Sequence, residues 1–279
     1  MTEITFIVSF EDLAPDFSTH LNYVCCLNTI SNGLKFQYNK NIREVINKSK
    51  YVQSKTTLVN ITKRSLDSEY STMQDNIEFA VVCVPWISVK AYYLIFTLYS
   101  LLFYLTDATE YYFTVSHKEF WKRLKDKLSN EELEFSVPDL NKCYDSATIL
   151  SRKQSPGNNI RIRNVNNQNR CFQILKKLLI YKVEELQRQE KLKDFRSKKS
   201  KEIRDNYLAR EKNNLCEFFY WYRIKANYRD MQFLDKKLSD EQFFSYYKNY
   251  YELTMNFYNA GVSLVNKLSQ IRIGHRLFK

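Results

Sequence analysis

The residues best placed to do chemistry lie in one short segment, residues 222–230, which reads YRIKANYRD. Arg223, Asn227 and Asp230 are spaced at i, i+4 and i+7, so they share one face if the segment is helical. The forked guanidinium of an arginine suits a site that contacts phosphate or a nucleotide. The same residues also suit a polar network that locks two helices together, with Arg223 bonded to Asp230 or to another carboxylate. The sequence leaves both interpretations open.

This segment contains no histidine, the side chain that most often moves protons near neutral pH. Tyr228 is a poor substitute, because a phenol titrates near pH 10 unless it is perturbed. Three histidines occur elsewhere in the chain. We expect His117 to brace the start of a helix. His275 lies 52 residues after Arg223 in a short basic tail, and His20 belongs to no motif.

A second candidate region is strongly basic. Residues 152–212 contain 18 Lys and Arg and 7 Asp and Glu, which gives a net charge of +11 against +12 for the whole chain. Such a concentration of positive charge attracts polyanions, although a solvated helix of mixed charge is the alternative. With two cations of the first segment, six side chains are predicted to contact RNA: Lys198, Lys199, Lys201, Arg204, Lys225 and Arg229.

The elements that position these segments are predicted to be helices. The chain has only four Gly and four Pro, and strand-rich folds need more turn residues than that. Residues 86–106 are almost entirely apolar, so we expect a helix that is buried on all sides at the centre of a bundle. Capping boxes at residues 116–119 and 239–242 predict helices that run to about residues 128 and 268. The sequence therefore predicts an all-α, up-and-down helical bundle.

Other stretches are harder to interpret. Residues 130–169 are rich in Asn and hold two prolines and a glycine, so they are expected to form a loop region. Residues 173–213 are predicted to form one long helix or two. Pro85 is expected to end one helix and to open the next, because proline is tolerated in a first turn. The first 65 residues show no catalytic signature.

Several classes of protein are disfavoured. Six cysteines without a C-x-x-C pair, and only three histidines, predict reduced and mostly buried thiols, no metal site and a cytoplasmic location. The N-terminal residues lack the basic start and apolar run of a secretory signal. The apolar run 91–105 is shorter than the roughly 20 residues that span a bilayer, so no membrane is expected. Glycine-rich nucleotide loops and H-E-x-x-H zinc helices do not occur, so no cofactor is expected.

Three segments together resemble the HEPN superfamily of helical bundles. KAYYLIF at residues 90–96 resembles the "AYYAMFHAARALL" helix of one HEPN branch, and SHK at 116–118 is similar to the "THR" start of its next helix. The segment from Arg223 to Asp230 resembles the "RxxADYDD" motif of that branch. This resemblance implies a HEPN-like helical domain over residues 66–279. Residues 131–212 would then be a long basic insertion and residues 1–65 an N-terminal extension of uncertain structure.

The resemblance also implies a function. HEPN ribonucleases are metal-independent, and they pair across a two-fold axis so that an Arg and a His of each subunit meet. Arg223 matches the family Arg, whereas Tyr228, Arg229 and Asp230 stand where the His should follow. We therefore expect an RNA-directed homodimer, a ribonuclease-like effector of prokaryotic defence or toxin–antitoxin systems, with Arg223, Asn227, Tyr228 and Asp230 as catalytic candidates.

Two alternatives remain open from the sequence. The missing histidine favours a non-catalytic HEPN module that binds RNA, a nucleotide or a protein partner, such as a cognate antitoxin or a nucleotidyltransferase. The third hypothesis is a plain helical interaction protein, in which the basic stretch docks an acidic partner.

Overall fold

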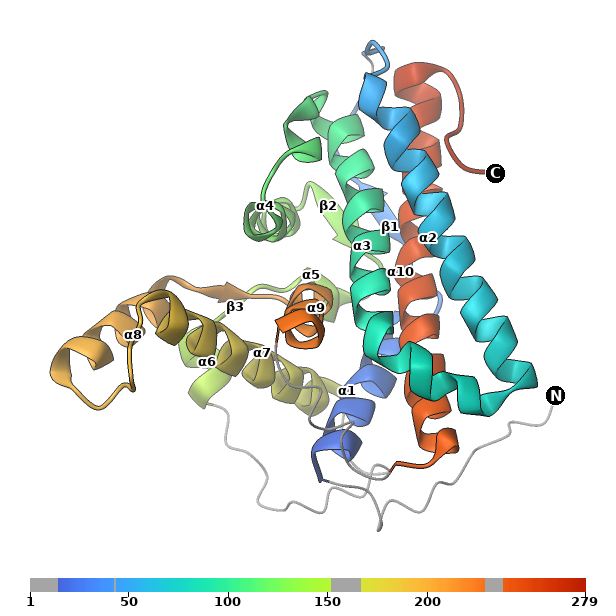
Figure 1. Cartoon of the computed structure of the whole chain (residues 1–279). Coiled ribbons are helices and arrows are strands. Elements are labelled where there is room, and N and C mark those ends of the chain that lie inside the picture. Colours follow the sequence, from blue (N-terminus) through green and yellow to red (C-terminus); the bar gives the residue numbers. More distant parts are fainter. Residues whose placement is uncertain (1–14, 43, 152–166, 229–237) are drawn as a thin grey trace.

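A computed structural model describes residues 15–42, 44–151, 167–228 and 238–279 (Figure 1). The principal helices are α1 (Pro15–Ser31), α2 (Lys50–Asp75), α3 (Ala80–Asp107), α4 (His117–Ser129), α7 (Asn167–Gln189), α8 (Lys198–Arg210), α9 (Phe218–Tyr228) and α10 (Asp240–Ile273). The short elements are α5 (Pro138–Asn141), α6 (Ser146–Ser151), the 3-10 turns η2 (Ile77–Phe79), η3 (Glu110–Phe113) and η5 (Leu215–Glu217), and strands β1 (Phe36–Tyr38), β2 (Leu133–Phe135), β3 (Tyr144–Asp145) and β4 (Lys212–Asn213). The predicted all-α bundle class is confirmed.

Helix α3 is the centre of the bundle, as its composition predicts. Every residue from 97 to 106 is buried, and α3 packs against α2, α9 and α10. Figure 1 shows α2, α3 and α10 side by side. Together with η2, α3 is long and apolar enough to cross a membrane by length and composition, and half of its most apolar window is buried inside the protein.

Pro85 does not separate two helices, contrary to the expectation from sequence. It lies inside α3, one turn after the first residue, Ala80. Because Pro85 has no N–H, only the carbonyl of Val81 loses its hydrogen bond within the helix. Val81 is exposed, so water can bond to that carbonyl instead. The helix bends in its early turns and then runs straight through the core (Figure 1).

Helices α3 and α10 pack tightly at Gly261. A Cβ atom at this position would lie 2.7 Å from the ring of Tyr99 and 2.8 Å from a methyl group of Leu98. The two backbones can therefore approach because glycine has no side chain. Tyr99 is fully buried there, and its hydroxyl donates to the carbonyl of Phe257 (3.2 Å).

Residues 130–151 are more ordered than the sequence suggests. β1 pairs with β2 in antiparallel register, with Phe36 opposite Phe135, and the two rings stack at 4.0 Å. β3 pairs with β4, so Tyr144 lies opposite Asn213. These elements depend on partners far away in the sequence, which local composition does not reveal.

The predicted capping residues open their helices. Ser116 accepts from the backbone N–H of Glu119 (3.2 Å) at the start of α4. The side chain of Gln242 accepts from the N–H of Ser239 (3.0 Å) at the start of α10. Helix α10 continues five residues beyond the predicted end and finishes at Gly274, which has a left-handed backbone (φ +79°).

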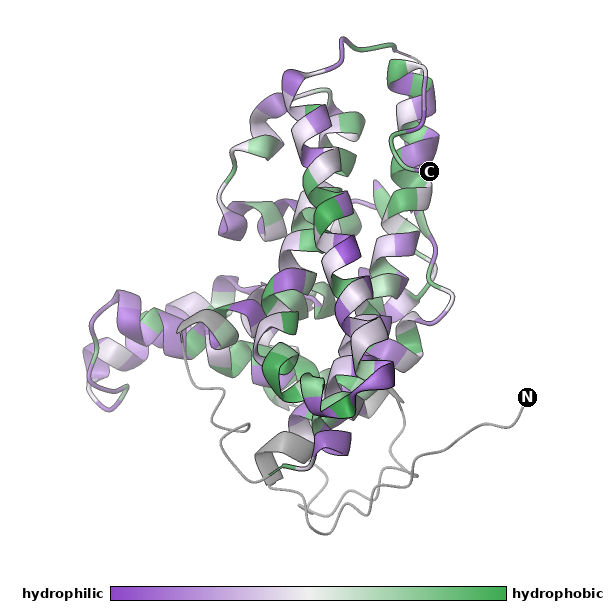
Figure 2. Cartoon of the chain, turned by 45° about the vertical axis from the view of Figure 1, so that its right-hand side comes forward, coloured by the Kyte–Doolittle hydropathy of each residue, from purple (hydrophilic) through white to green (hydrophobic). Residues whose placement is uncertain are grey.

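The N-terminal part and the basic region are both mainly helical where the structure describes them. In the N-terminal part, α1 packs on α10 and α7, and α2 packs on α3. In the basic region, α7 packs on α1 and α9, and α8 continues from it as an arm that projects from the bundle (Figure 1). Hydrophilic residues gather on the outer part of this arm (Figure 2). All six cysteines are free thiols, four of them buried.

Candidate functional site

The segment that leads into α9 is fixed by a dense set of hydrogen bonds. Asn214 accepts from the N–H of Cys216 (2.8 Å), and the carboxylate of Glu217 accepts from the N–H of Asn214 (3.1 Å), which completes a capping box. The amide of Asn214 also donates to the carbonyls of Leu140 and Lys142. Helix α9 therefore starts from a rigid position, and Arg223 lies between one and two turns further along.

Four charges, two of them buried and two half-buried, hold the same segment against its neighbours. Lys182 of α7 lies 2.6 Å from a carboxylate oxygen of Glu211 and 2.9 Å from one of Glu217. Lys125 of α4 lies 3.2 and 3.1 Å from the same two carboxylates. Burial alone would raise the pKa of Glu211, but Lys182 and Lys125 outweigh it and lower that pKa. The network joins α4, α7, the end of α8 and the start of α9.

Arg223 is a buried cation with unused donor capacity. Its residue is 8% exposed, its Nη2 donates to the hydroxyl of Tyr93 (3.0 Å), and its Nε is buried without a hydrogen-bond partner. The guanidinium lies 5.0 Å from the ring centre of Tyr92 and 5.2 Å from that of Tyr93, so both rings stabilise its charge. Within the described ranges, no carboxylate lies within ion-pair distance of it.

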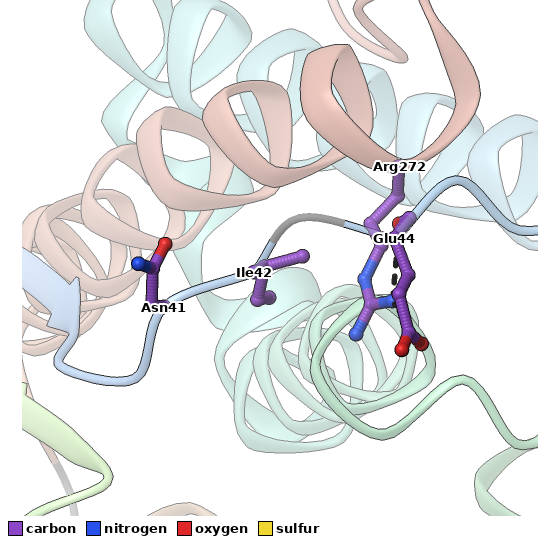
Figure 3. A pocket seen from close by; sticks show the side chains of 4 residues that line it. All are labelled: Asn41, Ile42, Glu44 and Arg272. Atoms are coloured by element: carbon purple, nitrogen blue, oxygen red, sulfur yellow. Dashed lines mark hydrogen bonds and ion pairs between the residues drawn. The ribbon is translucent and has the colours of Figure 1, made fainter.

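Arg272 shows what a structural arginine looks like in the same protein. Its guanidinium is equally buried, and it donates to the carbonyls of Leu105 (3.0 Å), Thr106 (3.1 Å) and Glu44 (3.1 Å). The first two of these bonds satisfy carbonyls in the last turn of α3. Figure 3 shows this side chain beside Glu44 in a shallow pocket. Arg272 thus bonds through all three of its nitrogens, whereas Arg223 bonds through one to the residues that the structure describes.

His117 lies in the same cluster as Arg223. It is the first residue of α4, and its Nδ1 lies 2.6 Å from the hydroxyl of Tyr92. Its ring packs on Phe96 (centroids 4.6 Å apart) and on Tyr93 (6.0 Å). Burial lowers the pKa of His117 below its usual value, and the charge of Arg223 lowers it further. The imidazole is therefore neutral at neutral pH.

The three segments that carry the HEPN resemblance thus meet in space. Tyr92 and Tyr93 come from the first, His117 from the second and Arg223 from the third. The sequence did not predict the contact between His117 and Tyr92, because it assigned this histidine only to the start of its helix. The signal in the sequence that indicated this site was the presence of all three segments in one chain.

The other candidates of the first segment are distributed differently. Asn227 and Tyr228 form the end of α9, whereas Arg229 and Asp230 lie outside the described residues. The expected interaction of Arg223 with Asp230 therefore stays a prediction. Lys225 is directed at α7, where it lies 3.5 Å from Glu184 and over the ring of Tyr181.

Most of the aromatic residues at the start of α9 belong to the core. Phe218, Phe219, Trp221 and Tyr222 are buried, and Tyr220 is half-buried. The four buried rings therefore offer no free face to a base.

Four of the six basic candidates lie on α8, away from α9 (Figure 1). Lys198, Lys199 and Lys201 are exposed there. Arg204 is half-buried, pairs with Asp205 (2.7 Å) and lies over the ring of Phe195. Of the six predicted RNA contacts, the structure therefore places three as exposed lysines on the arm, with Arg204 half-buried beside them. Lys225 lies on α9, and Arg229 lies outside the described residues.

Comparisons with known proteins give no match. No family model matches the chain, and neither a curated protein nor a solved structure does.

Proposed function

We propose that this chain is an RNA-directed protein of the HEPN type, a ribonuclease-like effector, in which the cluster around Arg223 contacts the phosphate of RNA. The observation that carries the proposal is the buried guanidinium of Arg223, which has spare donors, beside Tyr92, Tyr93 and His117. A cation without an ion pair to any described carboxylate can stabilise an entering phosphate strongly, because no such pair has to break first.

The lysine group on α8 supplies a second contact with the polyanion. Lys198, Lys199 and Lys201 are exposed and carry no ion pair with a described residue. Such cations bind phosphate without sequence preference, and their contribution falls as salt rises. In this proposal the arm captures RNA, and the Arg223 cluster contacts one phosphate of it.

The proposal includes a homodimer that forms through α3. Val82, Trp86 and Tyr93 lie at i, i+4 and i+11 on one helix face, and Trp86 is 57% exposed. An apolar stripe of this kind favours association. Tyr93 also bonds to Arg223, so a partner on the stripe would bring two such clusters close together.

RNA binding is tested by fluorescence anisotropy with a labelled single-stranded RNA of mixed sequence. Loss of a charged hydrogen bond predicts that Arg223→Ala weakens binding by about 10- to 100-fold. Arg276→Ala, an exposed arginine in the C-terminal tail, is the control and leaves the affinity unchanged. Equal affinities for wild type and Arg223→Ala, with both proteins folded by circular dichroism, would remove the cluster from RNA recognition.

The dimer is tested by light scattering after size-exclusion chromatography. Trp86→Glu is expected to convert a dimer into a monomer, because it places a charge in an apolar interface. Ile61→Glu on α2, a position as exposed as Trp86, is the matched control and leaves the dimer intact. A wild-type protein that is monomeric at micromolar concentration would exclude this interface.

The non-catalytic alternative has one observation in its favour. Helix α9 and the segment after it contain no histidine, and a HEPN module without one can bind RNA, a nucleotide or a protein partner without cleaving anything. Binding of the RNA probe without any cleavage product would support this alternative.

A further inference from the structure

His117 lies beside Arg223 with one ring nitrogen that is not bonded to any described residue. Its Nδ1 is held 2.6 Å from the hydroxyl of Tyr92, and its ring is packed against Phe96. The ring orientation is therefore fixed, and Nε2 is left available. His117 is half-buried and not enclosed in the core, so a ligand can reach it without unfolding the helix.

The surroundings of His117 favour a neutral imidazole, which can act as a base, and they also favour binding of an anion beside it. Arg223 approaches from α9, Tyr92 and Tyr93 approach from α3, and Lys118 and Glu119 follow it on α4. Burial and the guanidinium both lower the pKa of the imidazole. The N-terminus of α4, a helix of 13 residues, adds partial positive charge at the same place.

We infer that His117 is the proton-transfer residue of this site and that the substrate is an RNA phosphodiester, which it converts into a 2′,3′-cyclic phosphate and a 5′-hydroxyl. This inference rests on the proposed function. It places the acid–base group at the start of α4, whereas the HEPN motif would place it on α9. Tyr92 is the positioning residue, because its hydroxyl fixes the Nδ1 side of the ring.

The reaction balances without a metal or a cofactor. With Nδ1–H donating to Tyr92, the lone pair of Nε2 takes the proton from the 2′-hydroxyl of RNA. The 2′ oxygen attacks phosphorus, and the bond from phosphorus to the 5′ oxygen breaks. The leaving oxygen takes a proton from water, and the hydroxide that remains takes the proton held on His117. Arg223 stabilises the negative charge that develops on the phosphate oxygens.

The test compares cleavage with binding on the full-length protein. The probes are a labelled single-stranded RNA and its 2′-deoxy counterpart, which binds but lacks the nucleophile. His117→Gln keeps an amide that can bond to Tyr92, so the fold is retained. We expect it to lower the single-turnover cleavage rate by at least about 100-fold while its affinity for the deoxy probe stays within about three-fold. His275→Gln, on the exposed tail, is the control with unchanged rate.

Two further readouts identify the role of the residue. Mass spectrometry is expected to find 2′,3′-cyclic phosphate ends. The wild-type rate is expected to rise with pH and to level off at a pKa below the usual 6.5 of histidine. Tyr92→Phe frees the imidazole and is expected to lower kcat with little change in KM, an effect that simple loss of packing would not produce.

The outcomes separate the two proposals. RNA binding that depends on Arg223, with no cleavage between about pH 5 and pH 9 or with equal cleavage by His117→Gln, overturns the inference and leaves an RNA-binding protein. Absence of RNA binding overturns both. Products that end in a 3′-hydroxyl would also overturn the inference, because they require a different nucleophile.

Discussion

The ion pairs of Lys182 and Lys125 with Glu211 and Glu217 lead to a quantitative prediction about stability. The side chain of Lys182 is 1% exposed and lies within 3 Å of both Glu211 and Glu217. Lys182→Met removes one cation and leaves two carboxylates with Lys125 alone. Loss of one partner from a buried ion pair costs about 3–5 kcal/mol, and the remaining cation places the expected cost near the lower limit, about 3 kcal/mol.

That loss is measured by urea denaturation and by thermal melting. For a chain of this size, about 3 kcal/mol corresponds to a decrease in Tm of roughly 5 °C. Arg188→Met is the matched control, because Arg188 is 44% exposed and pairs with Glu185 on the same helix. An exposed pair of this kind contributes between about 0 and 1 kcal/mol. The control therefore melts within a few degrees of wild type.

Two further results distinguish charge from packing. The double variant Lys182→Met with Glu217→Gln is expected to recover part of the loss, because the uncompensated charge is gone while an amide oxygen still accepts from Asn214. The lowered pKa of Glu211 stabilises the protein above about pH 4.5, and this stabilisation is lost as pH falls below that value. A cost for Lys182→Met no larger than that of the control, or no recovery in the double variant, would refute this reasoning.

Three other predictions concern separate parts of the fold. Burial lowers the pKa of His20 to about 3, with smaller effects of Lys177 and Lys225. Between pH 6.5 and 4 the unfolded chain therefore binds a proton at His20 that the folded chain does not bind. As pH falls through this range, the wild type should lose up to about 1.4 kcal/mol of unfolding free energy per pH unit, and His20→Gln should lose less. Gly261→Ala should cost about 1–3 kcal/mol in urea denaturation, because the new methyl group overlaps the ring of Tyr99. Arg272→Met should lower Tm by several degrees through unsatisfied carbonyls at the end of α3, and an unchanged Tm would contradict that capping role.

The parts of the fold that sequence predicted are those set by local chemistry. The apolar run at residues 97–106 forced a buried helix, and the polar residues at Ser116 and Ser239 marked helix starts. Pro85 was misjudged because its effect depends on the exposure of Val81, which is a property of the packed bundle. The pairing of Phe36 with Phe135 likewise depends on residues that are 99 positions apart.

The candidate site was predicted in part. Arg223 was selected from its motif, and the structure places it in a buried cluster with the tyrosines of a second motif. His117 was assigned a local role, because sequence alone does not show that the start of α4 lies against α3 and α9. The basic candidates on α8 follow from charge counting, but their separation from Arg223 depends on the direction in which the arm leaves the bundle.

The position of α10 along the chain has a consequence for biosynthesis. Helix α3 ends at Asp107, and α10, which covers much of its surface, begins only at Asp240. Ribosomes add about 5–20 residues per second, so this interval lasts between roughly 7 and 27 s. Throughout it the nascent chain exposes the most apolar helix of the protein without its main partner. Binding of a chaperone to the nascent α3, or slower translation of the segment that forms α7 and α8, would therefore change the yield of folded protein. Neither would alter a contact in the folded structure.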